Sequence, residues 1–540
     1  MRDRGVSAPD GAAAVQKGLA LGVSLARAVV LAAVLPLAAL TTACATLAPV
    51  DAPASQALPA VHAEGLGRIA AEATPTGSAF RALPSADFAL DARLALIEHA
   101  RHSIDLQSYV LHDDDTGRIV LRALADAAAR GVRVRVLVDD LYSGDCTALL
   151  HGLQAHDRIE VRLFNPFAAG RGSIATRFAF SLHDFARVNH RMHNKLLIID
   201  GAFAIAGGRN IGDEYFRRGK DSNFVDFDLL LAGAVVPELA GVYDRYWNSG
   251  RAYPLRSIEA QPTDSPSLRA AFEQHTRDSV AEPLAPDVRD PLGHTPLSAE
   301  LRAGLPLRLL PGTVHALTDD PDKVGGLVPS ERSVSAQFVS AVMQAQTRVT
   351  LASPYFIPGE RGLAAMRAVR ERGVQIELVT NTVAANDEPF AGAAYARYRK
   401  ALLQMGVRIH EVGSGRLKAV HLFREALGSS TGRSHAKLTV IDGERVFVGS
   451  MNMDPRSARE NTELGLLIDS AELAHQVQRL LDLLRGGATY ELRLDAKGQC
   501  VLWIARDGDG ETVRDTDPEL RPETRLKLNL LSPFIPEGLL

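Results

Sequence analysis

Two stretches of this chain carry the same reactive side chains at the same spacing. Each has a histidine, a lysine two residues later, an aspartate five residues after the lysine, and then a glycine and an asparagine. The matching pairs lie 242 residues apart and are His193 and His435, Lys195 and Lys437, Asp200 and Asp442, Gly207 and Gly449, and Asn210 and Asn452. A pair of core histidines in duplicated strands does not explain a spacing kept over the whole block. We therefore expect two half-sites that together form one site.

The residue types in the two blocks are those that transfer on a phosphodiester requires. Two lysines can neutralise the non-bridging oxygens, which carry the negative charge of the transition state. One neutral histidine can attack phosphorus and form a phosphohistidine. The other, protonated, can donate to the leaving alkoxide and then activate the incoming alcohol or water, and such help is typically worth about 10²–10⁴-fold. Lysine and arginine supply the positive charge, so this scheme needs no cofactor and no metal. A zinc site at His190 and His193 lacks further ligands nearby.

The strands that carry these side chains set their directions. Residues two apart on a strand share a face, so His193 and Lys195 point the same way, as do their counterparts in the second block. Residues 196–199 are apolar on both faces, as in a buried strand. Asp200 and Asp442 each precede a glycine, and Asp-Gly is a hairpin-turn dipeptide. These two aspartates are therefore candidates for catalysis and equally for fixing the turn.

The return strand of each hairpin brings a glycine-containing segment back beside the histidine. Glycine there lets the backbone approach a ligand closely, and asparagine offers amide donors. The second block has Ser450 where the first has Gly208. The candidates for contact with the substrate phosphate are Lys195, Lys437, Asn210, Asn452, Gly208 and Ser450.

Each histidine also needs a carboxylate on its other ring nitrogen, because that contact sets its tautomer and orientation. Both blocks are followed by an acidic residue that begins an apolar run, DFDLLL from residue 226 and ELGLLI from residue 463. Alignment of the two runs places Asp226 opposite Glu463. The candidate catalytic residues are His193, Lys195, Asp200, His435, Lys437, Asp442, Asp226 and Glu463.

The duplication extends to whole domains. In the first half, a strand at residues 104–111, an amphipathic helix ending before Gly131 and a strand at residues 132–140 follow one another. The second half repeats this order, and its helix ends before Gly373, again 242 residues later. Strand, helix, strand is the pattern of a parallel sheet with helices packed on it. We predict two α/β domains, at residues 86–250 and 331–486.

The N-terminus has the pattern of an export signal. An apolar run at residues 28–40 is too short for a full membrane span and suits a signal peptide. It leads to the sequence LTTAC, which resembles a bacterial lipobox with Cys44 as the lipidated residue, although Thr41 stands where an aliphatic residue is usual. We predict a lipoprotein-type signal peptide at residues 1–44 and a body that faces the periplasm from the inner or the outer membrane. An uncleaved anchor or an ordinary signal peptide is the alternative.

Three further segments are predicted outside the domains. Residues 45–85, rich in Ala, Pro and Ser, are expected to be a flexible tether. Residues 251–330 are expected to connect the domains, with helices near 267–277 and 298–303. Residues 487–540 are expected to form a hairpin turned at 496–498 and a tail. Its stretch at 525–531 alternates charged with apolar residues, so it either contacts lipid headgroups or covers the second domain as a strand or helix.

Composition limits the class of protein. The chain has 540 residues, of which 46% are hydrophobic and 23% charged, which is globular composition with room for two domains. Its net charge of −4 argues against a nucleic-acid partner, because contacts to phosphates need a basic surface. Cys146 and Cys500 have no CxxC partner, so we expect two isolated thiols or, outside the cytoplasm, one disulfide.

The two blocks resemble the duplicated HKD motifs of the phospholipase D superfamily and, within it, the bacterial cardiolipin synthases of the C type. The resemblance runs from about residue 92 to the C-terminus. Its segments are IDLQSYVLHDDDTGRIVLRAL, GVRVRVLVDDL, HRMHNKLLIIDG, GGRNIGDEYF, GSMNMDPRSARENTELGLLI and IPEGLL. It implies a pair of pseudo-twofold-related α/β sandwich domains with the active site at their interface, and ping-pong transfer through a phosphatidyl-histidine.

The resemblance also implies roles for the candidate residues. His193 attacks and Glu463 orients it, while His435 is the acid and base and Asp226 orients it. We therefore expect a membrane-anchored phosphatidyltransferase that forms cardiolipin, with phosphatidylglycerol or phosphatidylethanolamine as substrates at a membrane surface. A hydrolase that releases phosphatidic acid differs only in its acceptor and is the alternative. A nucleic-acid phosphodiesterase is disfavoured by the acidic charge, and a binding module with a decayed site is disfavoured because both blocks are intact.

Overall fold

The computed structural model describes residues 52–171, 173–259, 264–325, 331–420, 430–507 and 510–531, and the single residues 47, 49, 427 and 535. The signal peptide predicted at residues 1–44, with Cys44, lies outside these residues. Within them, no helix is long and apolar enough to cross a membrane. The chain divides into two compact units, and residues 167–185 belong to a different unit from residues 49–166 and 186–540.

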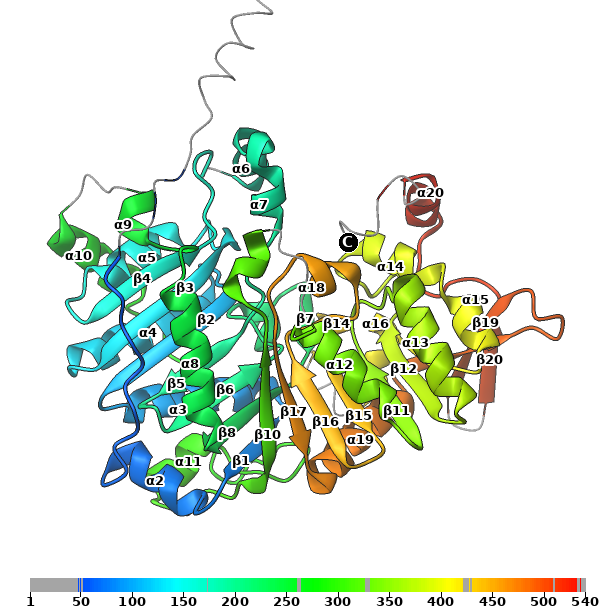
Figure 1. Cartoon of the computed structure of the whole chain (residues 1–540), viewed down its shortest axis with the longest axis horizontal. Helices are drawn as coiled ribbons and strands as arrows, with labels where there is room; N and C mark the ends of the chain where they lie inside the picture. Colours follow the sequence, from blue (N-terminus) through cyan, green and yellow to red (C-terminus); the bar gives the residue numbers. More distant parts are fainter. Residues whose placement is uncertain are drawn as a thin grey trace, which may run out of the picture. The chain divides into compact units, whose positions relative to one another are not determined.

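The larger unit is built on one sheet, which has 18 strands within the described residues (Figure 1). From one edge to the middle, the strands are β9 (Ala252–Pro254), β4 (Ile159–Phe164), β3 (Arg133–Tyr142), β2 (Ser103–Val110), β5 (Leu196–Ile199), β6 (Phe203–Gly207), β8 (Asp228–Gly233) and β1 (Ser78–Leu83). From the middle to the other edge, they are β10 (Leu310–Thr318), β17 (Leu464–Asp469), β16 (Arg445–Gly449), β15 (Leu438–Ile441), β11 (Arg348–Ala352), β12 (Gln375–Asn381), β13 (Arg408–Val412), β18 (Thr489–Leu494), β19 (Val501–Asp507) and β20 (Gly510–Arg514).

The two halves of this sheet repeat one topology. Strands β2, β3 and β4 are parallel, and so are β11, β12 and β13. In each half an antiparallel hairpin follows, β5 with β6 and β15 with β16. The halves join where β1 pairs with β10, and Figure 1 shows β10 and β17 side by side at this junction. The duplicated α/β architecture predicted from the sequence is confirmed.

Helices cover the sheet and join its strands. Those of the first half are α2 (Gly65–Ala73), α3 (Ala86–His99), α4 (Asp115–Ala129), α5 (Thr147–Gln154), α7 (Phe185–Asn189), α8 (Val235–Trp247) and α9 (Leu255–Ile258). Helix α6 (Ile174–Phe180) belongs to the smaller unit. The later ones are α10 (Ser265–His275), α11 (Leu297–Arg302), α12 (Val334–Met343), α13 (Gly359–Glu371), α14 (Pro389–Ala396), α15 (Arg399–Gln404), α16 (Ser414–Leu417), α18 (Pro455–Arg459), α19 (Ala471–Arg485) and α20 (Pro522–Leu531).

The crossover helices end where the sequence predicted. Gly131 follows α4 with a φ of 96°, and Gly373 follows α13 with a φ of 87°. This left-handed conformation suits glycine, which has no Cβ, and it turns the chain back toward the next parallel strand. The equal spacing of the two glycines therefore reflects two crossovers of the same construction.

A shared core joins the two halves. One cluster of buried apolar side chains takes Phe80 and Leu231 from the first half and Val314, Val440 and Leu466 from the second. Because these side chains bury one another across the junction, separating the halves would expose them to water. Burial of apolar side chains therefore stabilises the junction.

The prediction of a flexible tether was wrong for its C-terminal part. Residues 65–73 form α2, and residues 78–83 form β1, which is buried along its whole length between β8 and β10. The mixture of Ala, Arg and Phe in β1 does not alternate, because both faces of a central strand are covered. Tertiary burial thus makes a strand from a segment without visible periodicity.

The connection and the C-terminal segment contain more structure than expected. The two predicted helices of the connection are α10 and α11, but β10 was not predicted, and it joins the halves. The predicted hairpin is β18 and β19, turned at Gly498, and β20 extends it. The stretch at residues 525–531 lies in helix α20. Cys146 is buried and Cys500 exposed, and both are free thiols.

Candidate active site

Two short strands join the halves beside His435. β7 (Ser222–Val225) pairs in parallel with β14 (Thr431–Ser434). The register continues beyond β14, where His435 N donates to Val225 O at 2.8 Å. Asp226 follows Val225, so this pairing brings its carboxylate to the histidine, and His435 Nδ1 lies 2.6 Å from Asp226 Oδ2.

A related backbone contact holds His193. His193 N donates to Thr462 O and Thr462 N donates to Arg191 O, both at 2.9 Å. Glu463 follows Thr462, and its Oε2 lies 2.9 Å from His193 Nδ1. Each histidine therefore contacts a carboxylate of the other half. All four side chains are buried.

Gly208 and Ser450 occupy equivalent places against these carboxylates. A Cβ on Gly208 would lie 2.1 Å from Asp226 Oδ1, so only glycine leaves room for that aspartate. Glu463 is one methylene longer, and Ser450 Oγ donates to its Oε2 at 2.5 Å. The length of the partner carboxylate thus accounts for the difference between the blocks at this position. Contact of these two residues with a substrate phosphate stays a prediction.

Lys195 and Lys437 lie buried beside the histidines of their own blocks. Lys195 Nζ donates to His193 O at 2.6 Å, and Lys437 Nζ donates to His435 O at 2.7 Å. Lys437 Nζ also lies 3.0 Å from His435 Nε2, and Lys195 Nζ lies 5.1 Å from the centre of the Tyr109 ring. An ammonium has three donors, so each lysine can bind an anion beside its histidine while keeping its backbone contact.

Burial sets the charge of the histidines and lysines. It lowers the pKa of His193 to about 4 against the opposing pull of Glu463, and it lowers the pKa of His435 with Lys437 adding to the effect. Burial also lowers the pKa of Lys437 to about 8 and that of Lys195 below its usual range. At neutral pH both imidazoles are neutral. The carboxylate contact selects the tautomer with the proton on Nδ1 and leaves Nε2 with a free lone pair.

The two carboxylates stay ionised in spite of burial. Burial raises the pKa of Glu463, but His193, Lys195 and Ser450 outweigh it and hold this pKa at about 2. The pKa of Asp226 is likewise below its usual value, because His435 and the nearby cations outweigh burial. Each carboxylate can therefore stabilise the imidazolium that forms when its histidine takes a proton.

Aromatic rings pack against both histidines, and the sequence analysis did not assign them. The Tyr109 ring lies 4.9 Å from the His193 ring, edge to face. The Tyr215 and Phe224 rings lie 5.3 and 4.7 Å from the His435 ring. These rings limit rotation of the imidazoles and exclude water from them. Both tyrosines belong to segments on which the family resemblance rests, and that resemblance was the signal by which they could have been found.

The two asparagines of the motif differ in their contacts. Asn210 Oδ1 accepts from Val110 N at 3.3 Å, and its Nδ2 donates to Tyr215 OH at 2.8 Å. Asn210 thus positions the tyrosine that packs on His435. Asn452 donates through its backbone N to Ser457 Oγ at 3.1 Å. For both asparagines, contact with the substrate phosphate stays a prediction.

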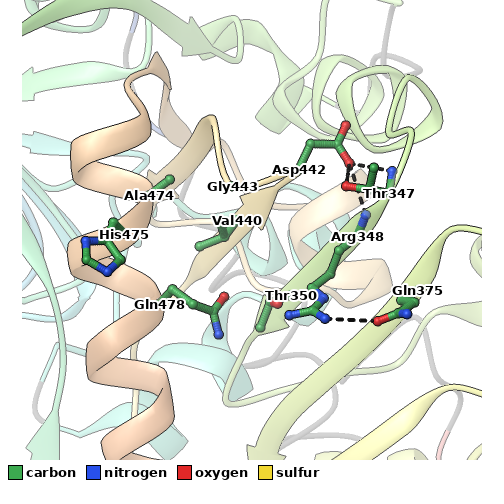
Figure 2. A pocket seen from close by; sticks show the side chains of 10 residues that line it. All are labelled: Thr347, Arg348, Thr350, Gln375, Val440, Asp442, Gly443, Ala474, His475 and Gln478. Atoms are coloured by element: carbon green, nitrogen blue, oxygen red, sulfur yellow. Dashed lines mark hydrogen bonds between the residues drawn. The ribbon is translucent and has the colours of Figure 1, made fainter.

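The motif aspartates accept hydrogen bonds from backbone amides, which supports the turn-fixing role that the sequence left open for them, while a catalytic role stays a prediction. Asp200 Oδ1 accepts from the amides of His102 and Ser103, and its Oδ2 from that of Arg101. Asp442 makes the equivalent contacts with Thr347, Arg348 and Gln346 at the start of β11, two of which Figure 2 shows. Both have a positive φ, 52° and 55°.

Their distance from the histidines follows from chain geometry. Seven residues of nearly extended chain separate His193 from Asp200, which is roughly 20 Å. The pocket of about 370 Å³ that contains Asp442 in Figure 2 therefore lies at the far end of the strand from His435. Of the two roles that the sequence left open, the contacts favour fixing the turn.

Two further acidic residues act on the site and were missed. Asp139 Oδ2 accepts from Met192 N at 2.8 Å and so holds the segment that carries His193; burial raises its pKa to about 6. Asp387 accepts from Tyr355 OH at 2.5 Å, and its charge acts to raise the pKa of His435. Asp139 is the last residue of β3 that pairs with the parallel strand β4, near the carboxyl end of both strands, and that position was the available signal. No group of three or more possible metal ligands occurs among the described residues.

Comparisons with known proteins agree with this geometry. The family model described as "Cardiolipin synthase, PLD-like domain" matches residues 94–247 and 338–484. Cardiolipin synthase C of Escherichia coli strain K12 is 35% identical over 457 residues, which cover 84% of this chain and 94% of that protein. Cardiolipin synthase A of Pseudomonas putida strain GB-1 is 27% identical over 395 residues, covering 73% of this chain and 65% of that protein.

A solved structure of lower sequence identity has a similar fold. The crystal structure of phosphatidylserine synthase from Haemophilus influenzae Rd KW20 matches with a TM-score of 0.55 at 15% identity, over 85% of this chain and 95% of that chain. The family model covers both halves, and the identity to the Escherichia coli relative extends over most of both chains. The chain therefore belongs to the cardiolipin synthase-like phosphatidyltransferases of the phospholipase D superfamily.

Proposed function

We propose that this enzyme forms cardiolipin by moving a phosphatidyl group from one phospholipid, phosphatidylglycerol or phosphatidylethanolamine, to a hydroxyl of another. The observation that carries the proposal is the crossed pair of histidine–carboxylate contacts, His193 with Glu463 and His435 with Asp226. Two buried lysines lie beside the same histidines. One nucleophile, one acid and base, and two cations are the groups that phosphodiester exchange requires.

In the first step, His193 Nε2 attacks the phosphorus of the donor lipid. A P–N bond forms, the bond from phosphorus to the headgroup oxygen breaks, and His435 Nε2 gives its proton to that oxygen. The released headgroup alcohol leaves, and the phosphatidyl group stays on His193. Lys195 and Lys437 bind the non-bridging oxygens, where negative charge accumulates in the transition state.

In the second step, His435 Nε2 takes the proton of the acceptor hydroxyl. The acceptor oxygen then attacks phosphorus, a P–O bond forms and the P–N bond breaks. His193 returns to its neutral state and His435 is again protonated. Cardiolipin results when the acceptor is the glycerol headgroup of phosphatidylglycerol, whereas water would give phosphatidic acid.

The two histidines are suited to different roles. The low pKa of His193, about 4, keeps its nitrogen lone pair available at neutral pH. The pKa of His435 is lowered by burial and by Lys437, and a bound phosphodiester anion would offset the charge of that lysine. Substrate binding would therefore favour the protonated His435 that the first step needs.

Product analysis tests the reaction. Vesicles that contain phosphatidylglycerol labelled in its headgroup and its acyl chains are incubated with the enzyme, and lipids and water-soluble products are separated. Cardiolipin with free glycerol supports the proposed transfer. Phosphatidic acid as the main product would mean that water is the acceptor, and the enzyme would then be a hydrolase.

A trapping experiment tests the order of the histidines. The donor is a phosphatidyl lipid with radioactive phosphorus and a nitrophenol leaving group, which departs without help from an acid. His435→Ala should therefore still form the labelled phosphatidyl-histidine. The label should stay on the protein, because the second step lacks its base. His193→Ala should take up none. Label held by His193→Ala would instead assign the nucleophile to His435.

We propose further that Cys44 carries a lipid that anchors the enzyme at a periplasm-facing membrane. The apolar run and the LTTAC sequence before it support this. Mass spectrometry of the protein purified from membranes tests it. An N-terminus that begins at an acylated Cys44 is expected, and an unmodified Cys44 inside a longer chain would refute the anchor.

A further inference from the structure

Residues 173–185 expose an unusual number of large apolar side chains. Ile174 is 47% exposed, Phe180 43%, Leu182 71% and Phe185 40%. They stand on α6 and on the short helix of residues 182–184 and α7 that follow it. Among the described residues, Val280, Leu305 and Val339 are exposed large apolar residues that occur singly along the chain. Scattered apolar residues are normal on a surface, whereas a concentration of them marks a contact.

The segment is held from within by other residues, so its apolar exposure is not a sign of poor packing. Phe178 packs edge to face on Phe167, with 5.3 Å between ring centres. Arg177 is buried, with its guanidinium 5.8 Å from the Phe167 ring. Ser173 caps α6 through the amide of Thr176. The inner face thus has its own anchors, and the outer apolar face is left for another partner.

The charge around this face is small. Residues 167–185 contain Arg171, Arg177 and Asp184, and Arg177 is buried. Few charged groups therefore lose their hydration when the exposed aromatic and aliphatic side chains enter the interface of a bilayer.

We propose that residues 173–185 dock the enzyme on the bilayer, with Ile174, Phe180, Leu182 and Phe185 entering the boundary between headgroups and acyl chains. This inference rests on the proposed function, because a phosphatidyltransferase must reach lipids that stay in a membrane. The segment leads directly into residues 189–193, which carry the nucleophile.

Helix α20 has a second exposed apolar surface, and its own exposed leucines are the evidence for it. Leu528 is buried, whereas Leu526, Leu530 and Leu531 are 62%, 61% and 51% exposed. Residues 521–531 contain three basic side chains and one acidic one. Of the two roles that the sequence left open for this stretch, contact with lipid headgroups therefore applies to its outer face, while its inner face packs on the protein.

Tryptophan fluorescence tests the docking in the full chain. The chain has two tryptophans, both buried, so a tryptophan added on the surface can be followed separately. Leu182→Trp and Leu530→Trp are reconstituted in vesicles of phosphatidylglycerol and phosphatidylcholine with brominated acyl chains. We expect the added emission to fall about threefold or more relative to unbrominated vesicles, because the ring enters the interface.

Val280→Trp is the control, since Val280 is 75% exposed and lies outside both elements. Its emission should not respond to bromine. Equal emission of Leu182→Trp in brominated and unbrominated vesicles would overturn the assignment of residues 173–185, and the same result for Leu530→Trp would overturn that of α20. The readout requires no turnover, so it decides the docking even if the proposed transfer reaction fails.

A kinetic comparison adds an independent readout. The rate on phosphatidylglycerol vesicles is divided by the rate on a monomeric short-chain analogue, for Leu182→Asp and for Val280→Asp. Leu182→Asp should lower this ratio about tenfold or more, because a charge replaces a side chain that enters the bilayer. Val280→Asp should not change it. An unchanged ratio for Leu182→Asp would overturn the docking role.

Discussion

Replacing Gly208 with serine should separate His435 from its carboxylate. The new Cβ would lie 2.1 Å from Oδ1, 2.8 Å from Cγ and 2.9 Å from Oδ2 of Asp226, so rotation of the carboxylate does not relieve the clash. Non-bonded carbon and oxygen atoms need about 3.2 Å or more, so Asp226 must move by about 1 Å. The hydrogen bond of 2.6 Å to His435 would then be lost.

We expect this substitution to lower the turnover rate strongly and to change substrate binding little. A misplacement of about 1 Å in a catalytic group lowers turnover roughly 10²-fold. We therefore expect Gly208→Ser to lower kcat for labelled phosphatidylglycerol by about 10²-fold, with a small change in KM, because Lys195 and Lys437 remain. Product formation by vesicle assay gives both constants, and circular dichroism verifies that the variant is folded.

The reciprocal change is the matched control. Ser450→Gly removes the hydroxyl that donates to Glu463 at 2.5 Å but introduces no clash. A hydrogen bond to a charged group is worth about 1.5–3 kcal/mol, of which the lower value corresponds to a factor of about ten. Because Glu463 keeps its contact with His193, we expect a reduction of about tenfold. If Gly208→Ser kept the kcat of the wild type, or lost no more than Ser450→Gly, close packing of glycine on Asp226 would not be the reason for the difference between the two blocks.

Three further predictions concern the carboxylates and the buried histidine. Glu463→Gln should lower kcat by about 10³-fold or more, because an amide can stabilise the wrong tautomer of His193 and does not compensate an imidazolium; a kcat within tenfold of wild type would exclude Glu463 as the orienting group. Asp200→Ala should lower the free energy of unfolding by about 3 kcal/mol, because three backbone amides lose their acceptor. Unfolding in denaturant measures this loss, and Asp442→Ala should show a smaller one, because Asp442 is more exposed. His193 titrates near 6.5 when unfolded and near 4 when folded, so the unfolded state binds more protons between these values and stability is lost as pH falls through this window. The difference in unfolding free energy between wild type and His193→Gln should change by about 3 kcal/mol from pH 7 to pH 4, and a pH-independent difference would contradict the burial of a neutral histidine.

Local pattern was enough for much of the fold. The crossovers that end at Gly131 and Gly373, the buried run before Asp200 and the hairpin at Gly498 all follow from periodicity and turn chemistry over a few residues. Strands β1 and β10 were missed, because each is defined by its partner in the sheet and not by its own pattern. β1 is covered on both faces and shows no alternation that could reveal it, whereas β10 is partly exposed and contains Pro311 and Gly312, which weaken a strand pattern.

The candidate site, like the fold, could be predicted only in part from the sequence. Repetition of the two blocks was sufficient to find His193, Lys195, His435 and Lys437, and alignment of the apolar runs found Asp226 and Glu463. Nothing in the blocks separated a catalytic aspartate from one that fixes a turn, and only the contacts of Asp200 and Asp442 with three backbone amides each did so. Asp387 acts on His435 from the loop before α14, and no sequence pattern joins this loop to the half-site; its hydrogen-bond partner Tyr355 lies in the loop after β11.

By itself, then, the sequence predicted which residue types would do the chemistry and that two copies of them come together, because spacing along a strand decides which side chains share a face. The tertiary structure alone decided how the copies meet. The contact of Thr462 with Arg191 and His193, and the pairing of β7 with β14, place each carboxylate on the histidine of the other half. These contacts join residues more than 200 positions apart, and only the burial of a core shared by both halves holds them at hydrogen-bonding distance.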